Sequence, residues 1–61
     1  MFEVMLIIEG EKVVYHSYDS HVAPIKGDVI TINDKEVFNV NKRLLGGVNG
    51  SNKIICFGTI E

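Results

Sequence analysis

The densest group of side chains able to do chemistry is the stretch YHSYDSH at residues 15–21, which holds histidine, aspartate, serine and tyrosine. Such residues can bind a metal ion or transfer protons. Side chains alternate across a β-strand, and an odd number of positions separates His16 from His21, so a straight strand puts them on opposite faces. No third ligand follows at a suitable spacing. We therefore expect no metal site. We interpret the stretch as an edge strand that has a solvent-exposed polar face and that leads into a loop.

Cys56 is the single cysteine, so the chain can form no internal disulfide. Nucleophilic catalysis would need this thiol beside His16 or His21. However, Cys56 lies in the apolar run IICFG, where a thiol more often packs as a small buried hydrophobe. A chain of 61 residues also has little room for a pocket of the usual ~300–1,000 Å³. We expect neither enzymatic activity nor a cofactor.

Lys42 and Arg43, with Lys53 across the following loop, form the basic focus of the sequence. A loop of this kind could contact phosphates. The chain has no tryptophan, its aromatic residues are not interleaved with the basic ones, and its net charge is −2. Nucleic-acid binders usually present a basic face and stacking platforms. Nucleic-acid binding is therefore kept as the alternative function.

Length and composition predict one small domain that spans residues 1–61. The hydrophobic fraction of 46% is that of an ordinary globular protein. No apolar run approaches the ~20 residues of a membrane span, and the apolar start of the chain lacks the features of a signal peptide. A lone free cysteine is typical of a reducing compartment. We expect a cytoplasmic protein that does not bind membranes.

Short runs rich in Val, Ile, Phe and Tyr, separated by Gly, Asn and Asp, predict an all-β chain. The expected strands are residues 2–8, 12–18, 28–32, 36–45 and 53–60. Gly58 inside the last strand indicates a bulge.

The connections follow from the residues between these runs. Gly10 can supply the positive φ of a tight hairpin turn, and residues 33–35 form a second turn. Residues 19–28 form the longest loop, with room for one helical turn started by Asp19 or Ser20. Residues 46–52 form a glycine-rich loop.

The segment APIKGDVITINDKEVFNV, residues 23–40, resembles a pattern of small SH3-like barrels. The pattern is Pro, two residues, Gly-Asp, an alternating apolar strand, a polar turn, and an aromatic residue followed by Val two positions on. It is carried here by Pro24, Gly27, Asp28, Val29, Ile30, Ile32, Lys35, Phe38 and Val40. The segment is similar to small β-proteins of bacteriophages and prophages, some of which are virion parts while others bind host proteins.

The resemblance implies a five-stranded SH3-like barrel of phage or prophage origin and carries over no active residues. It implies that Gly-Asp makes the turn into a strand and that Phe38 and Val40 face the core. An OB-like barrel is the alternative, although that fold often has a helix where this chain has only residues 33–35.

The first and last strands are apolar on both faces, and a small barrel can fill its interior with only one of them. We expect Met5, Ile7, Ile55 and Phe57 to form an exposed patch, because such patches usually mark contact surfaces. The alternative is that barrel curvature and the long loop, with Val22, Ile25 and Leu44, cover both faces of these strands.

The expected function is a protein-interaction module. The expected partner is a second copy, in a homodimer or small oligomer, or a host protein. A virion structural component is a further alternative. The polar rim of the patch would consist of Glu3, Glu9, Lys53 and Thr59.

Overall fold

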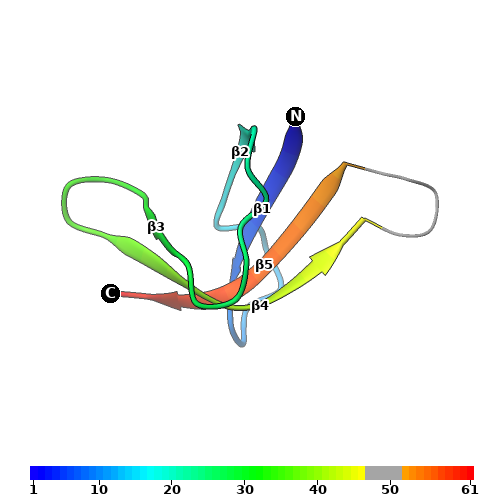
Figure 1. Ribbon diagram of the computed structural model, residues 1–61. Helices are drawn as coiled ribbons and strands as arrows, with labels where there is room; N and C mark the ends of the chain where they lie inside the picture. Colours follow the sequence, from blue (N-terminus) through cyan, green and yellow to red (C-terminus); the bar gives the residue numbers. More distant parts are fainter. Residues whose placement is uncertain (47–51) are drawn as a thin grey trace.

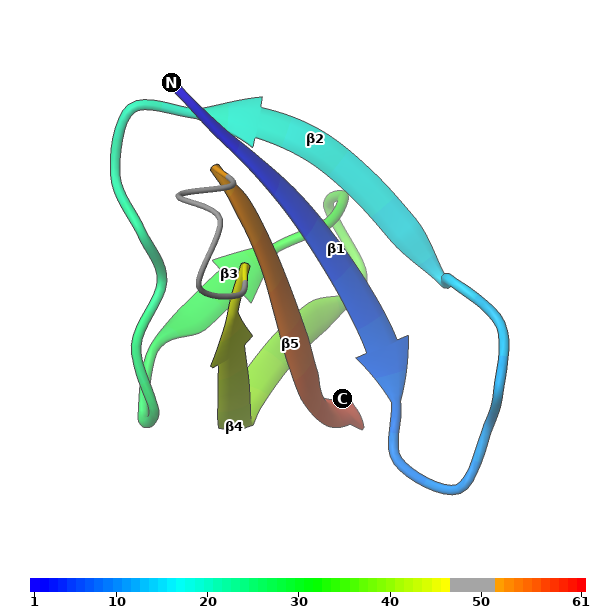
Figure 2. The ribbon, with the colours of Figure 1, turned by 90° about the vertical axis from the view of Figure 1, so that its right-hand side faces the viewer.

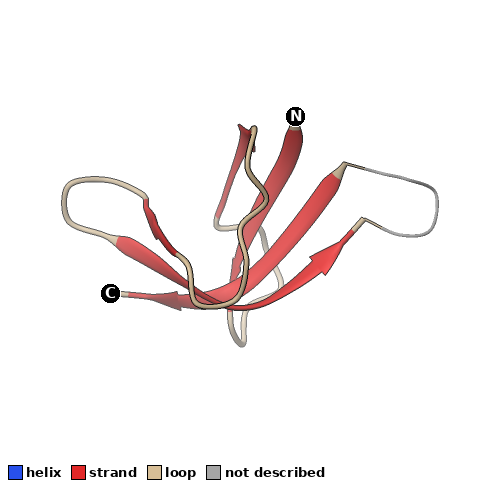
Figure 3. Cartoon of the chain, in the orientation of Figure 1, coloured by secondary structure: helices blue, strands red, loops and turns tan. Residues whose placement is uncertain are grey.

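The computed structural model describes residues 1–46 and 52–61, and in these ranges the chain forms strands and loops without a helix (Figure 3). The strands are β1 (Phe2–Ile8), β2 (His16–Ser20), β3 (Val29–Thr31), β4 (Val37–Leu45) and β5 (Lys53–Ile60). The predicted all-β class is confirmed, and β5 has the expected bounds. Most of the expected loop at residues 46–52 lies outside the described residues.

The described residues contain no helix long and apolar enough to cross a membrane.

All five strands belong to one sheet, in the order β2-β1-β5-β4-β3 (Figure 2). The neighbours are antiparallel except for β1 and β5, which run parallel. The sheet curls strongly into a half-barrel, with β2 and β3 as its two edges (Figure 1). The prediction of a small five-stranded barrel is confirmed in this form, and the strand order puts the first and last strands side by side at the centre.

The core lies on the inner face of the curl. Its members are at most 2% exposed and come from alternate positions of the three central strands: Val4, Leu6, Phe38, Val40, Ile54 and Cys56. Burying a side chain of this kind contributes about 1.5–3 kcal/mol, so these few residues dominate the stability of the sheet. The predicted core positions of Phe38 and Val40 are confirmed.

The loop between β2 and β3 covers part of this inner face. Pro24 is buried there, and Ala23 packs against the core. Gly27 has φ +96, and Asp28 Oδ2 accepts a hydrogen bond of 2.9 Å from the backbone N–H of Ile25. This side-chain contact closes the turn that leads into β3, as the Gly-Asp pair predicted.

The expected helical turn at Asp19 or Ser20 is wrong, because both residues belong to β2. Ser20 instead caps the turn that follows the strand. Its hydroxyl accepts from the N–H of Val22 and donates to the carbonyl oxygen of the same residue. The side chain therefore supplies hydrogen bonds to loop backbone where no strand partner exists.

The second strand begins later than residue 12, the expected start. The ladder with β1 pairs Leu6 with His16, and the N–H of Tyr15 donates to the carbonyl oxygen of Leu6 at 2.8 Å. The Tyr15 hydroxyl donates to Glu36 Oε2 at 3.0 Å, on the hairpin at the other edge of the sheet. Residues 9–15 form a broad loop between β1 and β2 rather than part of a strand. Gly10 in this loop has φ +87, as its predicted turn role requires.

The predicted bulge is found beside Gly58 but in the partner strand. The register of β4 against β5 shifts between Val40 and Lys42, and Val40 lies opposite Gly58. A Cβ on Gly58 would overlap the carbonyl oxygen of Asn39 and lie 2.9 Å from a ring carbon of Phe38. Glycine therefore allows the bulged strand to approach β5 closely.

Candidate functional site

Five apolar side chains lie next to one another on the outer face of the three central strands. We call them the outer patch: Met5, Ile7, Leu44, Ile55 and Phe57. The register pairs Met5 with Ile55 and Ile7 with Phe57, and Leu44 lies opposite Ile55 on the other side. Positions 4, 6, 54 and 56 of β1 and β5 fill the core, so alternation directs the four patch side chains of these strands outward. Leu44 shares the face of its register partner Ile55.

The outer patch does not belong to the core. None of its members is among the residues that form the core or pack against it. Met5, Ile7, Ile55 and Phe57 are half-buried, while Leu44 is 46% exposed. Strand contacts in the described part of the chain run only between neighbours in the sheet, so no further strand covers the patch there.

Charged residues of both signs border the outer patch. Glu3 lies on β1, and Glu9 directly follows that strand, whereas Lys42 lies on β4 and Lys53 on β5. Lys42 places its Nζ 5.7 Å from the centre of the Phe57 ring, a cation–π distance. Glu9 Oε1 accepts a hydrogen bond of 2.9 Å from Asn41. Of the expected rim residues, Glu3 and Lys53 pair with each other, and Thr59 pairs with Asn39 of β4.

The three basic residues of the alternative site do not converge. Arg43 lies opposite the buried Cys56, and its Nη1 donates to the carbonyl oxygen of Pro24 at 3.0 Å. Lys42 faces outward over Phe57. Lys42 is level with Phe57, and Lys53 lies four residues away along β5, which corresponds to about 13 Å. Arg43 therefore binds the loop between β2 and β3, whereas Lys42 and Lys53 lie far from each other on the outer face.

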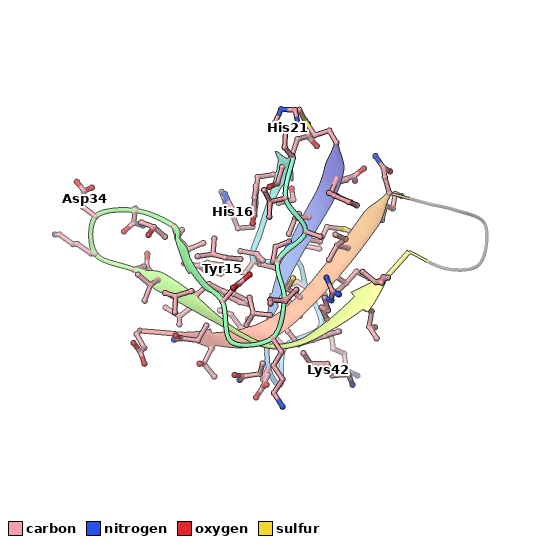
Figure 4. The ribbon with its side chains drawn as sticks, in the orientation of Figure 1. Tyr15, His16, His21, Asp34 and Lys42 are labelled. Carbon is pink, nitrogen blue, oxygen red and sulfur yellow. The ribbon has the colours of Figure 1, made fainter. Side chains whose placement is uncertain are left out.

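Of the polar stretch at residues 15–21, Tyr15 and His16 point to the inner side of the curl, whereas Lys42 lies on its outer side (Figure 4). The rings of His16 and Tyr18 are 6.2 Å apart, and His21 follows the end of β2. Within residues 1–46 and 52–61, no three His, Cys, Asp or Glu side chains are grouped to hold a metal ion.

Glu36 contacts this region although no pattern in the sequence singles it out. Its carboxylate accepts hydrogen bonds from Asn33 and from Tyr15, which together hold its pKa below the usual value. The same contact, aided by slight desolvation, raises the pKa of Tyr15. Because Tyr15 is 21 positions away, no local pattern could have revealed the pair. The contact links two hairpins at the surface.

Cys56 is fully buried, and burial raises the pKa of its thiol against the opposing influence of Arg43. The thiol is therefore protonated at neutral pH, and the protonated form is a poor nucleophile. Cys56 packs in the core, as its apolar neighbours predicted.

The chain matches no family model, no curated protein and no solved structure. Its function is accordingly inferred from the residues and geometry described above.

Proposed function

We propose that this protein is a non-enzymatic, SH3-like protein-interaction module of phage or prophage origin, which acts in the cytoplasm of the host cell. Its partner, a second copy or a host protein, binds the outer patch. The observation that carries the proposal is the presence of five adjacent apolar side chains outside the core. An apolar centre with an aromatic anchor and a charged border is typical of protein interfaces.

The contrast within the sheet supports this interpretation. A sheet with one face in water normally carries polar residues on that face. The edge strand β2 has polar residues, Ser17 and Asp19, at its outer positions. The central strands β1 and β5 break this pattern at Met5, Ile55 and Phe57. Apolar surface left in water forgoes roughly 25 cal/mol per Å², which a partner would recover.

The proposal is tested with the double variant Ile7→Ser, Phe57→Ser. The matched control is Val13→Ser, Val22→Ser, which changes two exposed valines outside the patch. Tagged forms are incubated with nuclease-treated lysate of the source or host cell and with a second copy under another tag. Mass spectrometry then measures what each form retains.

We expect the wild type and the control to retain a stoichiometric partner, and the patch variant to lose it while remaining folded by circular dichroism. If the patch variant unfolds, Ile7 and Phe57 are core residues and the proposal is wrong. Retention of the partner by the folded patch variant would place the contact elsewhere and would equally reject the proposal.

A further inference from the structure

We infer that the outer patch binds a second copy of this chain, and that two copies pack face to face about a two-fold axis running along β1 and β5. This inference rests on the proposed function and names its partner. A two-fold interface presents the same surface to itself, so that surface must be complementary to itself. The register of the two strands and the charges around the patch meet this requirement for one direction of the axis.

An axis along the strands, midway between β1 and β5, places β1 of each copy over β5 of the other. Residues at the same level in the parallel register then meet across the interface. Met5 faces Ile55 of the other copy and Ile7 faces Phe57, so the apolar centre is continuous. Glu3 is level with Lys53 and therefore faces Lys53 of the other copy, and this pair occurs twice.

The second direction, across the strands, gives the opposite result. That axis exchanges the two ends of β1 and brings Glu3 of one copy over Glu9 of the other. Like charges in an interface cost several kcal/mol. The charges at Glu3, Glu9 and Lys53 therefore favour the axis along the strands.

The shape of the sheet sets the expected strength. Two sheets packed face to face keep their strands within about 30° and lie about 10 Å apart, which suits one shared layer of Ile, Met and Phe side chains. The patch is on the convex side of the half-barrel, so contact is confined to its centre. Stable interfaces bury ~1,200–2,000 Å² in total, which is about 600–1,000 Å² from each partner. One copy of this chain exposes 4267 Å², and its curvature limits how much of that surface the other copy can reach. We expect a weak dimer whose population rises with concentration.

The test uses the charge variants Glu3→Lys and Lys53→Glu with light scattering after size exclusion, over a range of concentrations. Each variant alone faces two like-charged pairs across the axis, and we expect its dimerisation to weaken about tenfold or more. Mixed together, the two variants should form a one-to-one heterodimer visible by native mass spectrometry. Glu3 and Lys53 are also neighbours within one chain, and both variants keep like charges there, so recovery on mixing reports contact between chains.

Lys35→Glu is the matched control, because it makes the same charge change on the turn before β4, away from the patch. It should dimerise as the wild type does. Tighter dimerisation of Glu3→Lys would indicate the axis across the strands and overturn the inference. A wild type that stays monomeric at every concentration would also overturn it. If that monomer still captures a host protein that the patch variant loses, the proposed function stands and only the second copy is wrong.

Discussion

Gly58 shows how a single residue constrains this sheet. Its φ is one that any residue can adopt, so glycine is needed there only because of the atoms that surround it. The backbone carbonyl of Asn39 and the ring of Phe38 occupy the volume that any Cβ would need. A backbone carbonyl held by the sheet cannot rotate away as a flexible side chain can. Residue 58 must therefore be glycine for β4 and β5 to pair with this bulge.

We expect Gly58→Ala to lower the free energy of unfolding by about 1–3 kcal/mol, the range for overpacking a filled site. Gly27→Ala, where space is open but φ is +96, should lose roughly 1–2 kcal/mol through backbone strain alone. Thr59→Ala, on the exposed outer side, is the control. Urea denaturation followed by circular dichroism measures all three, and equal midpoints for Gly58→Ala and Thr59→Ala would contradict the steric interpretation.

At the scale of elements, local patterns located the strands better than they located the connections. Short runs rich in Val, Ile and Phe predicted β1, β4 and β5 closely, because each strand carries its own signal. The predicted start of β2 is wrong because Val13 and Val14 resemble strand residues locally but lie exposed in the loop before His16. Likewise, Gly58 revealed an irregularity but not that the extra residue lies in β4. Contacts between distant segments decide such features, and one sequence does not encode them locally.

The link between Tyr15 and Glu36 predicts a pH dependence. Hydrogen bonds from Asn33 and Tyr15 lower the pKa of Glu36 from its ordinary 4.5. A carboxyl whose pKa is lower in the folded state stabilises the fold above its unfolded value, and this contribution is lost as pH falls through the lowered value. Tyr15 has the opposite sign: its raised pKa stabilises the fold below its ordinary 10.0 and is lost as pH rises through the raised value.

We therefore expect the melting temperature of the wild type to fall as the pH drops below about 4.5, and to fall less in Glu36→Gln. The effect should be small because both groups are at the surface. Glu11→Gln, in the exposed loop before β2, is the control. Melting curves between about pH 6 and pH 3 measure the difference, and parallel profiles for wild type and Glu36→Gln would show that the link contributes nothing.

At the scale of the whole molecule, the outer patch follows from alternation in β1 and β5, which the sequence shows directly. The arrangement of its border does not. Glu3 and Lys53 come together only because β1 and β5 pair in parallel, and no pattern in one sequence predicts that pairing. For the same reason, Lys42, Arg43 and Lys53 looked like one basic group in the sequence although the fold separates them.

This separation predicts weak affinity for nucleic acids. We expect no binding of the wild type to mixed single-stranded DNA or RNA in fluorescence anisotropy at low salt. Phosphate contacts weaken steeply with salt, so any binding found at low salt is measured again at physiological ionic strength. Tight, salt-sensitive binding that Lys42→Glu, Lys53→Glu removes would favour the nucleic-acid alternative over protein interaction. If the double variant binds nucleic acid as tightly as the wild type, residues other than Lys42 and Lys53 make the contact.

The parallel pair at the centre of the sheet also bears on how the chain acquires its structure. Each hairpin can form from nearby residues, but β1 and β5 join segments from opposite ends of the sequence. Pairings of such high contact order make folding slow, since a long loop must close first. During synthesis, β1 has no parallel neighbour until β5 leaves the ribosome. A nascent chain therefore displays apolar residues on both sides of β1, and the interval before β5 emerges is when it is most prone to aggregate.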